Sequence, residues 1–167
     1  MTEGGTHMGT TAGDAWTIAE AAWDDPDGET LRQAQRDEIA ILHGGNRNSE
    51  PGTPPSARDI SLFVIARDGD GRALACGALR QLDAASAEVK RMYVRPEMRG
   101  TGLSVAVLHA LEDAARSRGW TTLRLETGKV MPVAIRFYER EGYTPIPAFG
   151  PYVGSDNSRC YEKRLQP

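Results

Sequence analysis

The sequence lacks the features that mark several large classes of protein. It contains no apolar run of about 20 residues, so it predicts no membrane-spanning segment. Acidic residues outnumber basic ones, 23 to 20, and the formal net charge is −3, whereas a general nucleic-acid binder needs a basic field. The two cysteines and three histidines form no cluster with metal-ligand spacing. We therefore expect no membrane partner, no nucleic-acid partner and no metal.

The N-terminal segment lacks the parts of a signal peptide. Residues 1–14 are rich in Gly and Thr and carry neither a basic stretch nor an apolar core. We expect a disordered leader over residues 1–14, with residues 1–8 open as native sequence or cloning remnant, and a single domain over residues 15–167. The expected location is cytoplasmic. Without a secretion signal, Cys76 and Cys160 are expected as reduced thiols.

What is present fits one globular domain of mixed α and β structure. The 167 residues can build one core, and a charged fraction of 26% argues against wholesale disorder. Apolar patterning and turn signals predict strands at 15–23, 61–67, 73–82, 87–94, 121–126, 143–146 and 158–165. Helical spacing of apolar residues predicts helices at 29–43, 103–118 and 132–141. Asp24 or Asp25 is the predicted N-cap of the first of them.

The strand predicted at 87–94 carries charged and apolar residues in alternation. Regular alternation would place Glu88, Lys90, Met92 and Val94 on one face of the sheet. The glycine segment and helix that follow lead to the strand at 121–126, so we expect these two strands to be parallel with a right-handed crossover.

The segment Arg99–Ser104 (RGTGLS) lies between that strand and that helix. Its backbone N–H groups and the helix N-terminus can bind an anion, and glycine lets the backbone approach a phosphate closely. The structural alternative is a tight turn without a ligand. No Lys-Ser or Lys-Thr follows the glycines and the dinucleotide GxGxxG spacing is absent, so neither of those phosphate motifs is present.

A second segment, 131–143, predicts a short helix that ends at Gly142 and leads into a strand. On local evidence alone, Tyr138 would be a core residue of that helix. Together, however, the two segments resemble the GNAT superfamily of acyl-CoA-dependent N-acyltransferases over roughly residues 61–165. The family's loop pattern, Arg/Gln-x-x-Gly-x-Gly/Ala, is met at Arg99 and Gly102, and Ser104 departs from it. The segment AIRFYEREGY is similar to the family's second motif.

The resemblance implies an α/β (α+β) fold. It has a central mixed, mostly antiparallel twisted sheet of about seven strands, flanked by about four helices. A V-shaped split is expected between the fourth strand, which ends at Val94, and the fifth, which ends near Thr127. Acetyl-CoA is expected in that split as a co-substrate. Its pantetheine would pair with the strand backbone and its pyrophosphate would lie on the glycine segment.

The resemblance assigns several residues to acetyl-CoA and to catalysis. The expected cofactor-binding residues are Met92, Tyr93, Val94, Arg99, Gly100, Thr101, Gly102, Leu103, Ser104, Met131 and Arg136. Met131 stands where many members carry Asn, and a thioether cannot donate a hydrogen bond. For Arg136, a solvated helix face is the alternative to a contact with the CoA phosphates.

Tyr138 is expected to protonate the departing CoA thiolate, with thiol positioning without proton transfer as the alternative. Glu88 is expected as the base, with a structural carboxylate paired with Arg91 or Lys90 as the alternative. Glu126 is expected to bind the substrate ammonium.

The implied activity is transfer of an acetyl group from acetyl-CoA to a primary amine of a small molecule, by direct attack in a ternary complex. The alternatives are a non-catalytic acyl-CoA-binding sensor and a protein (lysine or N-terminal) acetyltransferase. A homodimer is left open. The acceptor depends on the segments 44–57 and 147–157, which offer charges of both signs, Glu50 among them, and the aromatic rings of Phe149 and Tyr152.

Overall fold

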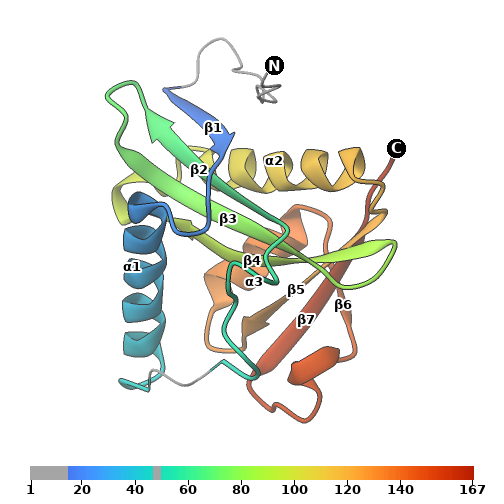
Figure 1. Cartoon of the computed structure of the whole chain (residues 1–167). Helices are drawn as coiled ribbons and strands as arrows, with labels where there is room; N and C mark the ends of the chain where they lie inside the picture. The colour runs from blue at the N-terminus through green and yellow to red at the C-terminus, as the bar shows by residue number, and fades with distance from the viewer. Residues whose placement is uncertain (1–14, 47–49) are drawn as a thin grey trace.

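The computed structural model describes residues 15–46 and 50–167. The expected leader, residues 1–14, lies outside the described residues. The strands form one sheet in the order β1-β2-β3-β4-β5-β7-β6 (Figure 1). Their bounds are β1 Trp16–Glu20, β2 Leu62–Asp68, β3 Ala73–Gln81, β4 Ser86–Val94, β5 Thr122–Gly128, β6 Thr144–Ile146 and β7 Ser158–Arg164.

Helices cover both faces of the sheet. The α-helices are α1 Pro26–Leu42, α2 Leu103–Ser117 and α3 Pro132–Arg140, and the short 3-10 helices are η1 Pro96–Met98 and η2 Gly150–Tyr152. Of the two N-caps predicted for α1, the structure selects Asp25, whose carboxylate accepts the Asp27 N–H at 2.9 Å. None of the described helices is long and apolar enough to span a bilayer.

The sheet is mixed and mostly antiparallel, as predicted. Its one parallel pair among the described strands is β4 with β5, which α2 connects. These two strands pair only at their beginnings, between Ser86–Glu88 and Thr122–Arg124. Beyond Glu88 the strands no longer pair with each other, which confirms the expected split between the fourth and fifth strands.

The core lies in two clusters, one on each face of the sheet. The larger contains Val107, Leu108 and Leu111 of α2, with Tyr138 of α3. The smaller contains Leu31 of α1 with side chains of β2, β3 and β4. Helices α2 and α3 therefore pack on one face and α1 on the other. Both cysteines are buried and free, which confirms the prediction of thiols.

A bulge interrupts β4 at Arg91, which has a positive φ of 54°. On either side of the bulge, Cys76 of β3 pairs with Tyr93 of β4, and Ala78 of β3 pairs with Lys90 of β4. The two pairs are two residues apart on β3 but three residues apart on β4. One extra residue therefore lies in β4. The Cys76 thiol donates to the Arg91 carbonyl at 3.3 Å, so the extra residue is held by its neighbour strand.

The bulge corrects the predicted alternation. Val89, Met92 and Val94 all pack on the α2 side of the sheet, while Tyr93 packs on the α1 side. With regular alternation Val89 could not share a face with Met92 and Val94. The prediction that Glu88 lies on the same face as Met92 is therefore wrong.

Candidate active site

The glycine turn between β4 and α2 has the geometry of an anion site. Gly100 and Gly102 have φ values of 77° and 90°, and a Cβ at either position would meet no atom within 4 Å. The Ala106 N–H donates to the Gly102 carbonyl at 3.0 Å. The N–H groups of the first turn before Ala106, which include those of Leu103 and Ser104, therefore have no acceptor within the helix.

Arg99 is tied to protein groups beside this turn. Its Nε donates to the Val94 carbonyl at 3.1 Å, and its guanidinium contacts the Glu38 carboxylate of α1 at 2.8 Å. The Glu38 ion pair is largely exposed. A phosphate at the turn would therefore compete with Glu38 for Arg99 in a solvated setting.

The backbone of β4 turns one edge toward the split. The Arg95 N–H donates to the Leu74 carbonyl of β3 at 3.0 Å, so the groups of the preceding residue, Val94, point the opposite way. The carbonyls of Met92 and Val94 accept side-chain donors, from Gln35 at 2.8 Å and from Arg99. This arrangement directs the Val94 N–H into the split.

Tyr138 lies on the face of α3 that packs against the core. Its ring contacts those of Tyr143 and Phe137, with centroids 5.7 and 5.1 Å away. Its hydroxyl makes no hydrogen bond within the described part of the chain. Burial raises the pKa of Tyr138 above the ordinary value near 10, so the phenol is a neutral donor across the physiological range.

The other two residues predicted on this segment differ in their surroundings. Met131 precedes α3, and its Sδ lies 3.9 Å from the Thr127 hydroxyl of β5. The thioether thus lies beside a hydroxyl that is itself a hydrogen-bond donor. Arg136 is exposed on the outer face of α3.

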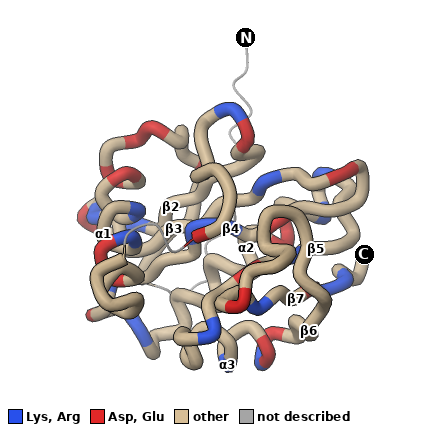
Figure 2. The backbone as a smooth tube through the Cα atoms, turned by 90° about the horizontal axis from the view of Figure 1, so that it is seen from below, with Lys and Arg blue, Asp and Glu red and all other residues tan. Residues whose placement is uncertain are grey.

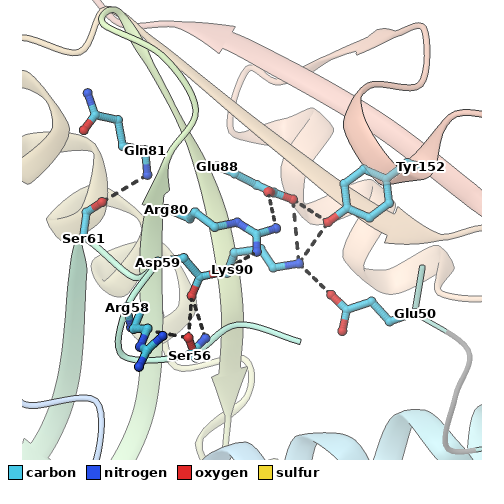
Figure 3. Close-up of polar contacts among 10 residues, drawn as sticks. All are labelled: Glu50, Ser56, Arg58, Asp59, Ser61, Arg80, Gln81, Glu88, Lys90 and Tyr152. Atoms are coloured by element: carbon cyan, nitrogen blue, oxygen red, sulfur yellow. Dashed lines mark hydrogen bonds and ion pairs between the residues drawn. The ribbon is translucent and has the colours of Figure 1, made fainter. Parts of the chain in front are cut away.

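Glu88 lies on the face of β4 opposite to that of Met92, where it belongs to a buried polar network (Figure 3). Its side chain is 1% exposed and accepts hydrogen bonds from Arg80 at 3.0 Å and from the Tyr152 hydroxyl at 2.6 Å. The Lys90 ammonium lies 3.7 Å from it and donates to the Tyr152 oxygen at 2.9 Å. Because both carboxylate oxygens are engaged, these contacts favour the structural alternative for Glu88, with Arg80 rather than Arg91 as the close partner.

Sequence reasoning did not identify Arg80 in this network. Arg80 is directly opposite Glu88 in the β3–β4 register, and a cross-strand acid–base pair is the signal that could have found it. For Tyr152 the sequence predicted only an aromatic ring beside the acceptor. Burial, and then the charge of Glu88, raises its pKa, so its hydroxyl stays a donor to Glu88.

Glu50 and Glu126 are two further carboxylates that interact with Lys90. Glu50 contacts Lys90 at 2.6 Å and Arg91 at 2.8 Å. Burial opposes its ionisation, but these two cations lower the pKa of Glu50 overall. Burial raises the pKa of Glu126 on β5, and the charges of Glu50 and Glu88 act in the same direction. Viewed from below, charges of both signs are interspersed over the molecule (Figure 2).

Comparison with known proteins agrees with this geometry. The model of the acetyltransferase (GNAT) family matches residues 16–143. An IAA acetyltransferase from Azospirillum brasilense is 36% identical over 108 residues, which cover 64% of this chain and 69% of that protein. A provisionally assigned acyl-CoA N-acyltransferase from Klebsiella pneumoniae has a TM-score of 0.77 at 34% identity, covering 90% of this chain and 98% of its own.

The fold is also found with acetyl-CoA bound. A GNAT family acetyltransferase from Elizabethkingia anophelis, crystallised with acetyl-CoA, has a TM-score of 0.67 at 14% identity and covers 91% of this chain and 99% of its own. Within the described ranges, no three His, Cys, Asp or Glu side chains are grouped so that they could hold a metal ion.

Proposed function

Because the chain belongs to the acetyltransferase (GNAT) family, whose members use acetyl-CoA, we propose that this N-acetyltransferase acetylates the primary amine of a small molecule. The observation that carries the proposal is the split between β4 and β5, with a glycine turn and unpaired helix amides at its end. The likeness to a relative named IAA acetyltransferase supports a small acceptor.

Acetyl-CoA is proposed to lie in the split. Its pantetheine runs along Met92–Val94 and its pyrophosphate lies on Arg99–Ser104, where the turn leaves space against its amides. The carbonyls of Met92 and Val94 already accept side-chain donors. The Val94 N–H is therefore the group proposed to donate to an amide carbonyl of the pantetheine, and the thioester lies farther along the strand, beside Met92 and away from the pyrophosphate.

The proposed reaction is a direct transfer. The neutral amine attacks the thioester carbon, the new C–N bond forms, the C–S bond breaks and CoA leaves as a thiolate. The Tyr138 hydroxyl is proposed to donate to that sulfur. Because burial raises its pKa, hydrogen bonding to the thiolate is favoured over complete proton transfer.

The attacking amine must also lose a proton. Glu88 is the weaker candidate because Arg80 and Tyr152 already stabilise its ionised form. Glu126, proposed to bind the substrate ammonium, has a raised pKa and is a stronger base than an ordinary carboxylate. We therefore propose that Glu126 accepts the proton of the amine, directly or through water. Glu88 instead positions Tyr152 and Lys90.

A thiol-release assay tests the activity. Free CoA is measured from acetyl-CoA with a panel of amines, amino acids and aminoglycosides, and with lysine-containing and N-terminal peptides. Release with a small amine supports the proposal. Release with peptides alone indicates a protein acetyltransferase, and saturable CoA binding without any release indicates an acyl-CoA sensor.

Gly102→Glu tests the phosphate position. The carboxylate would stand beside the proposed pyrophosphate and is expected to weaken CoA binding. The positive φ of 90° strains any side chain here, so Gly102→Gln is the matched control for strain. Calorimetric titration should give a Kd for CoA roughly tenfold higher for the Glu variant than for the Gln variant. Equal Kd values in two folded variants would contradict the placement.

A further inference from the structure

Two cationic side chains of β4 hold one carboxylate of the chain itself. Lys90 and Arg91 follow one another on β4, and each donates to a different oxygen of the same carboxylate, that of Glu50 (Figure 3 shows the Lys90 contact). The side chains of Lys90 and Arg91 are only 7% and 11% exposed, whereas Glu50 is 33% exposed. Two nearly buried cations thus share one acid that solvent can reach.

These cations depend on that acid. Within the described residues, Glu50 is the carboxylate that forms an ion pair with Arg91. The other carboxylate near Lys90 is that of Glu88, 3.7 Å away and already bonded to Arg80 and Tyr152. Leaving nearly buried cations without a partner is strongly unfavourable. An anion therefore belongs at this position whether Glu50 or a ligand supplies it.

The position also suits one end of an acceptor. Arg91 forms the bulge immediately before Met92, where the thioester is proposed to lie. On the other side of the split, the charges of Glu50 and Lys90 both act on Glu126. An amine near Glu126 and an acid at Lys90 and Arg91 would thus lie within one small site.

We propose that Lys90 and Arg91 bind the carboxylate of an acceptor that carries both an amine and a carboxylate, and that Glu50 occupies this position in the free protein. This rests on the proposed acetyl transfer and specifies its substrate class as amino-acid-like. A protein lysine side chain carries no such acid, so the inference disfavours a protein acceptor.

The test compares amino acids with their α-carboxamides, which keep the amine and remove the negative charge. In the CoA-release assay, the acid form should have a kcat/KM at least roughly tenfold higher than its amide. Arg91→Gln should remove that preference, mainly by raising KM for the acid. The matched control, Arg72→Gln, removes an exposed arginine paired with Glu97 and should retain the preference.

Glu50→Gln distinguishes a ligand position from a purely structural ion pair. If Glu50 stands in for the substrate acid, the variant should have a lower KM for the acid form and a larger rise in Tm on addition of that amino acid than the wild type. A structural pair predicts a lower Tm that no amino acid restores, and that outcome would overturn the inference.

The two proposals fail differently. CoA release with equal kcat/KM for acid and amide overturns the carboxylate site and leaves acetyl transfer standing. If no amine releases CoA, acetyl transfer fails, and the site is judged by binding alone. An amino acid panel that then raises the Tm of the wild type no more than that of Arg91→Gln, with CoA present, overturns the site as well.

Discussion

Tyr138→Phe is expected to lower kcat by about 10²–10⁴-fold while leaving the KM for acetyl-CoA nearly unchanged. The substitution removes only the hydroxyl, and the ring contacts with Tyr143 and Phe137 remain. The CoA thiolate would then leave without its proposed donor. Steady-state kinetics with a small amine measure the effect. Turnover at the wild-type rate would return Tyr138 to the role of a packing residue.

Tyr143→Phe is the matched control for this experiment. Tyr143 is also buried, on the same side of the sheet, and its hydroxyl has no hydrogen-bond partner among the described residues. Removing an unsatisfied buried hydroxyl should leave the Tm unchanged or raise it, and should leave kcat unchanged. A similar fall of kcat in both variants would indicate a packing effect rather than loss of a donor.

Glu126→Gln is the second large effect that we expect. Gln cannot accept the proton of the amine, so kcat/KM for the amine should fall by roughly 10²–10⁴-fold near neutral pH. In the wild type, activity should fall with decreasing pH as the carboxylate is protonated, at a pH above the ordinary value of 4.5 because burial raises this pKa. A variant that kept the acidic limb of the pH profile would exclude Glu126 as the base.

The same substitution, Glu126→Gln, should raise the stability of the folded protein at pH 8 although it lowers the activity. A carboxyl whose pKa is raised on folding favours the folded state at pH below its unfolded pKa, and this contribution is lost as pH rises through the folded pKa. At pH 8 the ionised Glu126 is therefore a cost to the wild type. Glu126→Gln should have the higher Tm at pH 8, and its advantage should shrink toward pH 4.

Glu88→Gln is expected to lower the Tm, because it weakens a buried pair with Arg80.

Local sequence determined most of the elements. The cap of α1 and the glycines after β4 each act through the conformation of a few neighbouring residues, so the sequence narrowed the cap to Asp24 or Asp25 and located the glycines. The order of a strand, a glycine segment, a helix and a strand also predicted the parallel pair, whereas the split beside it was expected from the resemblance to the GNAT superfamily. The local elements and the parallel pair depend on short-range stereochemistry and on the handedness of crossovers.

Only the tertiary structure decided which charged side chains meet around the split. The bulge at Arg91 arises from pairing with β3 and reverses the faces that alternation predicts for Met92 and Val94. The Tyr152 contact with Glu88 joins residues 64 positions apart, and the Glu50 contact with Lys90 spans 40. Such contacts depend on strand register and on loops folded back over the sheet, and no local pattern encodes either. The resemblance to the GNAT superfamily therefore predicts a position for acetyl-CoA, whereas the surroundings of the acceptor depend on the tertiary structure, because the charged residues there pair across distant segments of the chain.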